Sequence, residues 1–225
     1  MTELGAPQDP TRDHRSLTAA AEKRLLVWLA HRMPAWLNSD HLTALGLLGN
    51  ALAGVGYGLA GRDPRWLHFV NVCLFVNWFG DSLDGTVARV RNRLRPRYGF
   101  YVDHLVDAFG ALFLLLGLAA SGLVTERVAL ALLVTYFLFS INMYLATCSL
   151  GVFKLSYGLF GGTELRILLA SVNLLVLFYP RGVFLGRTFL LFDILAGLGT
   201  AGLAFITLRS AAQVTKRLFD QERLD

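Results

Sequence analysis

The chain has 225 residues, of which 55% are hydrophobic and 16% charged, and its formal net charge is +5. Soluble domains carry about 25% charged residues, so this composition excludes an ordinary soluble enzyme and predicts an all-α polytopic membrane protein. Nucleic acids also attract basic chains, but here the arginines flank apolar stretches, where membrane topology explains them. We therefore expect membrane lipids as partners and no nucleic acid.

The chain order predicts one membrane domain with polar ends. Residues 1–16 are expected to be disordered, and Leu17–Met33 to form an amphipathic helix lying in the membrane interface. Residues 17–213 would make a single domain, followed by a polar helical tail over residues 214–225. Six transmembrane helices are expected by length and hydropathy, the first of them glycine-rich for close packing: Leu42–Ala60, Trp66–Val90, Gly99–Ser121, Arg127–Leu150, Glu164–Tyr179 and Thr188–Leu208.

Basic residues predict the orientation of these spans. With six spans, both termini lie on the same side as the loop that follows the second span. The opposite loops carry fewer basic residues, so the positive-inside rule places both termini and this loop in the cytoplasm. Contact with anionic lipids is a second expected role of the loop. Its arginines are Arg89, Arg91, Arg93, Arg95 and Arg97.

Four aspartates lie where the second and third spans meet. Asp81 and Asp84 are three residues apart and Asp103 and Asp107 four apart, so each pair shares one helix face. A short linker makes the two helices antiparallel, and at ~1.5 Å per residue Asp84 and Asp107 would both lie roughly 10 Å from it. An ionised carboxylate in a bilayer costs at least ~2.5 kcal/mol, so four of them predict a function. The pattern favours a carboxylate box for one or two divalent cations, with the site on the cytoplasmic side.

The same run follows the pattern D-x-x-D-G-x-x-A-R, nine residues, then G-x-x-x-D-x-x-x-D. This resembles the signature of the CDP-alcohol phosphotransferase family. The resemblance implies an integral-membrane enzyme, commonly a homodimer, that uses divalent metal to cleave a CDP-alcohol and release CMP. The phosphoalcohol is then joined to a second alcohol. All eight fixed positions match: Asp81, Asp84, Gly85, Ala88, Arg89, Gly99, Asp103 and Asp107.

The resemblance also implies a role for each position. Asp81, Asp84 and Asp103 would be chiefly metal ligands, and Asp107 would take the acceptor's proton while also contacting metal. The implied cofactor is Mg²⁺ or Mn²⁺, as two ions, which suits the neutralisation of a pyrophosphate. Glycine lets a ligand approach the helix closely, and arginine can pair with phosphate through two hydrogen bonds. The CDP-alcohol would bind at Asp84, Gly85, Ala88, Arg89, Gly99 and Thr43.

Thr43 belongs to the segment SDHLTALG, which resembles the family's P-N-x-L-T-x-x-G entrance to the first span. Ser39 and Asp40 stand where that pattern has Pro and Asn, and either could instead cap the helix that follows.

The acceptor is expected near His104, Lys154 and Arg166. The Asp103–His104 pair resembles eukaryotic choline/ethanolamine phosphotransferases, and His104 could touch the acceptor or pack behind the site. Lys154 and Arg166 flank a glycine-rich segment at the cytoplasmic ends of the fourth and fifth spans. They could bind an acceptor phosphate or anchor helices at the interface.

Three hypotheses for the function remain open. The first is an enzyme of phospholipid biosynthesis that moves a phosphatidyl group from CDP-diacylglycerol to a small hydroxyl acceptor, with release of CMP. An alternative form of this enzyme resembles a choline/ethanolamine phosphotransferase and uses a CDP-aminoalcohol as donor and diacylglycerol as acceptor. The second is a prenyltransferase, which needs aspartate motifs on well-separated helices. The third is a carboxylate-lined ion-coupled transporter, which is expected to show broken helices or repeats. Metal-dependent release of CMP separates the first from the others.

Overall fold

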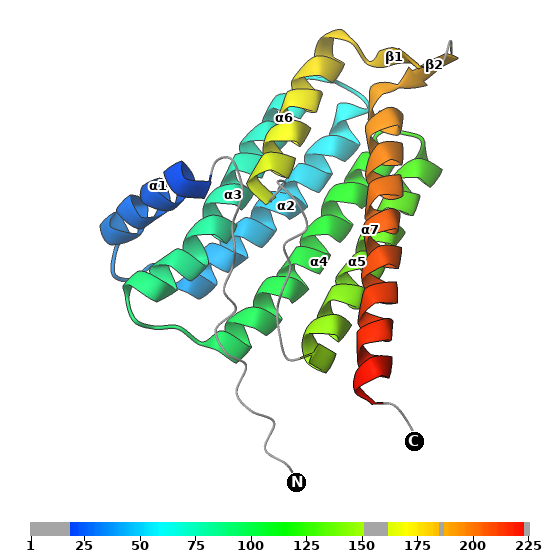
Figure 1. The fold of residues 1–225 in the computed structure, drawn as a ribbon. Coiled ribbons are helices and arrows are strands. Elements are labelled where there is room, and N and C mark those ends of the chain that lie inside the picture. Colours follow the sequence, from blue (N-terminus) through cyan, green and yellow to red (C-terminus); the bar gives the residue numbers. More distant parts are fainter. Residues whose placement is uncertain (1–18, 151–161, 185–186, 223–225) are drawn as a thin grey trace.

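A computed structural model describes residues 19–150, 162–184 and 187–222 of the chain. Helix α1 (Ala19–Arg32) precedes six longer helices, and a two-stranded hairpin joins the last two of them. The six run alternately up and down, so that the start of α2, the α3–α4 loop and the end of α7 lie at one end (Figure 1). The bounds are α2 (Ser39–Ala60), α3 (Trp66–Val90), α4 (Pro96–Ala120), α5 (Glu126–Leu150), α6 (Gly162–Phe178), β1 (Arg181–Phe184), β2 (Arg187–Leu190) and α7 (Leu191–Gln221).

Each of the six expected spans overlaps one of these helices, but six membrane crossings are not confirmed. Within the described ranges, α2, α4, α5 and α7 are long and apolar enough to cross a membrane. Helix α6 has only 17 residues. Helix α3 has 25 residues but carries Asp81 and Asp84, which lower its mean hydropathy. Four such helices agree with an integral membrane protein, and the number of crossings stays a prediction.

The expected start of the last span, Thr188–Leu208, is wrong. Residues 188–190 belong to β2, which pairs antiparallel with β1 so that Arg181 lies opposite Leu190. Helix α7 then continues past Leu208 to Gln221, because no glycine or proline interrupts residues 209–221. The expected helical tail is therefore confirmed as far as Gln221. Residues 1–16 lie outside the described residues, and the division into one domain with two polar ends stays a prediction.

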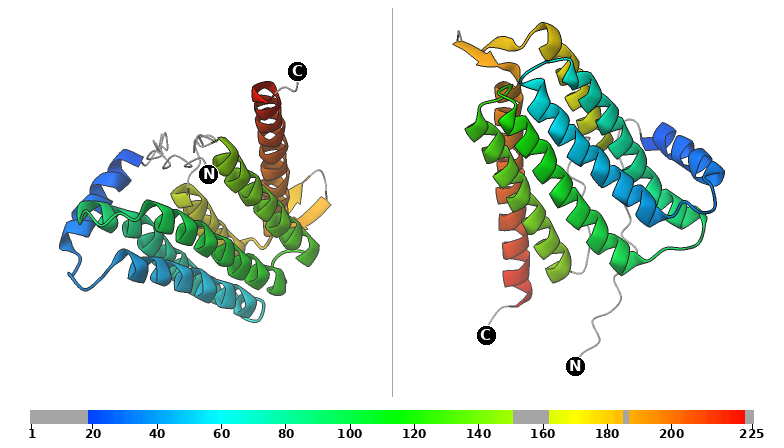
Figure 2. Two further views of the ribbon diagram at one scale, coloured as in Figure 1. Left: turned by 90° about the horizontal axis from the view of Figure 1, so that it is seen from below. Right: turned by 180° about the vertical axis from the view of Figure 1, so that it is seen from behind.

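Helix α2 packs against both α3 and α4, and glycines make these contacts close (Figure 2). A Cβ atom added at Gly49 would lie 2.8 Å from the backbone nitrogen of Asn77 on α3. One added at Gly54 would lie 2.2 Å from the carbonyl oxygen of Phe113 on α4. The expected close packing is confirmed at these two glycines, whereas Gly58 faces open space. The glycines of α2 therefore let the backbones of α3 and α4 approach that of α2 closely.

The amphipathic helix expected at Leu17–Met33 is present as α1, which lies beside α3 at an angle to the bundle (Figures 1 and 2). Its Leu26 and Ala30 are buried in one apolar cluster with Leu83 and Val87 of α3. Trp28, two residues after Leu26 and therefore on another side of the helix, is 51% exposed. Helix α1 thus packs on the segment of α3 that carries Asp81 and Asp84.

Arg91, in the arginine loop, has a structural role that the sequence analysis missed. Its guanidinium donates hydrogen bonds to the carbonyl oxygens of Leu37 (2.6 Å), Met33 (2.9 Å) and Pro34 (2.9 Å). These carbonyls lie in the connection between α1 and α2, and that of Pro34 also accepts a hydrogen bond from the backbone N–H of Leu37. Arg91 therefore fastens the α1–α2 connection to the end of α3. Nearby, Arg95 forms an ion pair with Asp40 at the start of α2.

The close α2–α4 contact at Gly54 gives a test of the fold. Gly54→Ala places a methyl group against the α4 backbone, and overpacking of this kind costs about 1–3 kcal/mol. Gly58→Ala is the matched control on the same helix, where added helix propensity stabilises by roughly 0.5–1 kcal/mol. Thermal unfolding of the detergent-purified protein should show a lower midpoint for Gly54→Ala only. Equal midpoints for the two variants would contradict the α2–α4 contact.

Candidate active site

The four aspartates lie on two helices that are held in place mainly through α2. Helix α3 carries Asp81 and Asp84, and α4 carries Asp103 and Asp107. Both helices pack extensively on α2, whereas their contacts with each other are few. The two pairs of aspartates therefore lie on helices that pack on α2 and make little direct backbone contact with each other.

The depth of the four aspartates differs from the expected one. Helix α4 begins at Pro96 rather than at Gly99, because proline suits the first turn of a helix. At ~1.5 Å per residue, Asp103 then lies roughly 10 Å into α4, close to the depth of Asp84 in α3. Asp107 lies one turn deeper, nearer the level of Asp81. By this residue count Asp84 is level with Asp103, whereas the sequence predicted that it is level with Asp107.

Each aspartate of α3 has a polar partner from another helix. The hydroxyl of Thr43 on α2 donates a hydrogen bond of 2.6 Å to Oδ2 of Asp84. The guanidinium of Arg166 on α6 forms an ion pair of 2.7 Å with Oδ2 of Asp81. Thr43 and Arg166 were both expected near a ligand, and the structure places both against the carboxylates. Arg166 supplies positive charge beside Asp81 and near Asp107.

Asn77 is a site residue that the sequence analysis missed. It is buried on α3, and its Nδ2 donates to the carbonyl oxygen of Gly46 at 2.9 Å. Its Oδ1 accepts a hydrogen bond of 2.6 Å from Nε of Arg166. Asn77 precedes Asp81 by four residues and therefore lies on the same helix face. That spacing was visible in the sequence, and it could have marked Asn77 as a partner of the aspartates.

The carboxylates are close enough to interact but are not gathered around one point. Asp107 lies within electrostatic range of Asp81, Asp103 and Asp84, and also of Arg166. Within the described residues, however, no three His, Cys, Asp or Glu side chains are arranged as a metal site. The contacts of Asp81 with Arg166 and of Asp84 with Thr43 occupy oxygens that a cation would need. The donor set, four carboxylates, still has the chemistry that hard divalent cations prefer.

His104 packs among aromatic side chains on the α5 side of the site. Its ring lies 4.2 Å from that of Phe100 and 4.9 Å from that of Tyr144, between ring centroids. Its Nδ1 is 2.7 Å from the carbonyl oxygen of Phe100. The Tyr144 hydroxyl donates to the carbonyl oxygen of His104 at 3.4 Å. These contacts hold the ring between Phe100 and Tyr144.

The positions expected to meet the nucleotide are open. A Cβ atom at Gly85 would meet only Nη2 of Arg89, at 3.9 Å, and one at Gly99 would meet nothing within 4 Å. Arg89 is exposed and forms no ion pair with any residue in the described part of the chain. Ala88 is partly buried one turn after Asp84. Lys154, expected near the acceptor, lies outside the described residues.

Residues 36–203 match the family described as CDP-alcohol phosphatidyltransferase. Two curated relatives are similar over a shorter part. Cholinephosphotransferase 1 of Gallus gallus is 31% identical over 96 residues, which cover 40% of this chain and 28% of that protein. Cholinephosphotransferase 1 of Xenopus laevis is 33% identical over 100 residues, which cover 42% of this chain and 25% of that protein. The aligned part thus spans about a quarter of the length of these relatives.

Proposed function

Because the chain belongs to the CDP-alcohol phosphatidyltransferase family, we propose that it transfers a phosphatidyl group from CDP-diacylglycerol to a small alcohol. The acceptor oxygen forms a bond to the phosphorus that carries the lipid, and the bond from that phosphorus to the bridging oxygen breaks. CMP leaves with the electron pair, and the acceptor's proton goes to Asp107. One observation carries this proposal: the family match includes all eight positions of the aspartate signature on α3 and α4.

We propose that Asp81, Asp84, Asp103 and Asp107 hold two divalent cations, Mg²⁺ or Mn²⁺. Such cations neutralise a pyrophosphate and stabilise the entering and leaving oxygens. The oxygen-only donor set and the electrostatic coupling of the four carboxylates support this assignment. Arg166 balances the charge of Asp81 before a cation binds.

The nucleotide side of the proposed site comprises Thr43, Gly85, Ala88, Arg89 and Gly99. The open faces of the two glycines leave room for a ligand beside the helices. The guanidinium of Arg89, lying next to Gly85, is proposed to pair with a phosphate of the CDP-alcohol. The hydroxyl of Thr43 holds Asp84 in place.

The acceptor side is proposed to comprise His104, Arg166 and Lys154. His104 follows Asp103 in the chain and packs on Tyr144 at the α4–α5 contact, and Arg166 reaches the cluster from α6. The family resemblance also implies a homodimer, which a mass measurement on the solubilised protein would check.

A choline/ethanolamine phosphotransferase-like reaction is the second candidate. In it, a CDP-aminoalcohol would be the donor and diacylglycerol the acceptor. Two observations favour it: the similarity to two vertebrate proteins named cholinephosphotransferase 1 and the Asp103–His104 pair. The two reactions share the metal site and the release of CMP, so they differ only in which partner carries the lipid.

A product assay tests both forms of the reaction. Purified protein is supplied with CDP-diacylglycerol and a mixture of choline, ethanolamine, serine and inositol, or with CDP-choline and diacylglycerol. We expect CMP and a new phospholipid in one of the two mixtures, and only with Mg²⁺ or Mn²⁺. Chromatography measures CMP, and mass spectrometry identifies the lipid. Full CMP release in excess chelator would overturn the metal assignment, and absence of CMP in every mixture would overturn the transferase.

Substitutions of two aspartates separate the base from the ligands. Asp107→Asn keeps an oxygen ligand but cannot accept a proton, so turnover should fall by about a hundredfold or more. Binding of the CDP-alcohol should weaken far less. Asp84→Asn should instead damage metal and nucleotide binding together. Turnover and nucleotide affinity are measured on the same preparations. Near-normal turnover of Asp107→Asn would remove it as the base, and His104 would be tested next.

We propose that the arginine loop, the active site and both termini are cytoplasmic, since most basic residues lie at that end. The test places single cysteines at Arg93 and Arg62, which lie at opposite ends of α3, in a chain whose Cys73 and Cys148 are replaced. An impermeant thiol reagent applied to intact cells should label Arg62→Cys and spare Arg93→Cys. The reverse pattern would place the site on the outer side and contradict the proposal.

A further inference from the structure

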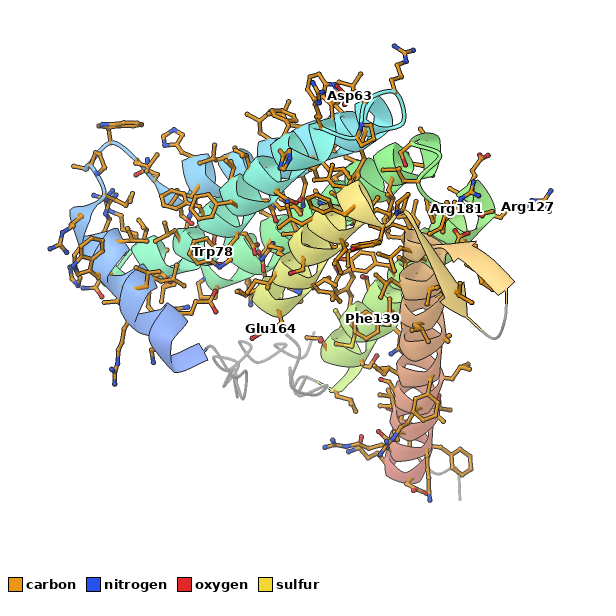
Figure 3. The ribbon with its side chains drawn as sticks, turned by 90° about the horizontal axis from the view of Figure 1, so that it is seen from above. Asp63, Trp78, Arg127, Phe139, Glu164 and Arg181 are labelled. Atoms are coloured by element: carbon orange, nitrogen blue, oxygen red, sulfur yellow. The ribbon has the colours of Figure 1, made fainter. Side chains whose placement is uncertain are left out.

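Glu22 of α1 joins two helices that carry polar residues of the site. Its Oε1 accepts a hydrogen bond of 2.9 Å from Nε1 of Trp78 on α3. The same oxygen accepts a hydrogen bond of 2.6 Å from the hydroxyl of Thr163 in the first turn of α6. In Figure 3, Trp78 lies on the α1 side of α3, and the label of Glu164 marks the first turn of α6. One carboxylate therefore links α1, α3 and α6.

Both donors lie one turn from residues of the carboxylate site. Trp78 precedes Asp81 by three residues on α3, and Thr163 precedes Arg166 by three residues on α6. Residues three apart lie on the same face of a helix. Arg166 in turn contacts Asp81 at 2.7 Å and is 18% exposed. A displacement of the first turn of α6 would therefore move Arg166 relative to Asp81.

Helix α1, which carries Glu22, is itself attached to α3. Leu26, one turn after Glu22, is buried against α3. The far end of the helix is fastened by the three hydrogen bonds from Arg91 to carbonyl oxygens. Helix α6 also packs mainly on α3. The hydrogen bond from Glu22 therefore ties the first turn of α6 to a second helix that lies on α3.

We propose that Glu22 is a positioning residue, which acts by holding the first turn of α6 so that Arg166 stays opposite Asp81. Its role in turnover rests on the proposed transferase function, but its effect on the position of α6 does not. Removing its carboxylate leaves the Trp78 and Thr163 donors without this partner, and α6 loses a connection to α1.

The activity test uses Glu22→Ala, two further variants of α1, the Arg166→Ala variant and one double variant. Glu22→Ala removes the acceptor, whereas Glu22→Gln keeps an oxygen that can accept both hydrogen bonds. Lys23→Ala is the matched control on the same helix, because Lys23 is exposed. CMP release should fall by about tenfold in Glu22→Ala and stay within about twofold in Glu22→Gln and Lys23→Ala. In an Arg166→Ala background, Glu22→Ala should add no further loss, because residues that act as one unit are not additive.

A second readout does not depend on activity. Spin labels at Phe75 of α3 and Leu168 of α6, both exposed, report the distance between these helices in a chain lacking the native cysteines. Glu22→Ala and Thr163→Val should each shift or broaden this distance distribution, and Glu22→Gln should leave it unchanged. An unchanged distribution in both of the first two variants overturns the inference. A shifted distribution in a protein that makes no CMP would instead refute the transferase and keep the positioning role.

Discussion

Repulsion among four carboxylates in a largely apolar bundle is the constraint around which the site is organised. Like charges in a medium of low dielectric constant repel strongly, so each must be balanced or hydrogen-bonded. In this chain Arg166 pairs with Asp81, and Thr43 donates to Asp84. Both partners come from other helices, so the acidic cluster also links α3 to α2 and α6. A bound cation would provide the same balance, as the proposed metal site requires.

Close packing of α2 makes these contacts possible. Where Gly46 and Gly49 face α3, the two backbones approach closely enough for Asn77 to donate to a carbonyl oxygen of α2. The same approach brings the Thr43 hydroxyl within 2.6 Å of Asp84. Helix α4 is fixed to the other face of α2 at Gly54. The carboxylates of α3 and α4 are therefore placed relative to one another through a third helix, without direct packing of their backbones.

Much of this arrangement could be predicted from the chain, since apolar runs of span length and the fixed spacing of the aspartates are local patterns. The limits of α3 agree with the expectation at both ends. The hairpin at Arg181–Leu190 was missed because a short apolar run there looks like the start of a span. The roles of Asn77, Arg91 and Glu22 were missed for another reason. Each acts through a partner far away in the sequence, and only the folded chain brings those partners together. The four aspartates remain a predicted metal site.

Binding of Mn²⁺ to the purified protein, counted by electron paramagnetic resonance of the free ion, tests the central claim most directly. The account predicts saturable binding that is lost in Asp84→Ala and Asp103→Ala. It also predicts that binding is kept in Asp63→Ala, whose aspartate lies at the opposite end of α3. This measurement needs no knowledge of the donor or the acceptor. Mn²⁺ binding that is unchanged when Asp84 and Asp103 are replaced, or no binding by the unaltered protein, would contradict a metal-dependent carboxylate site.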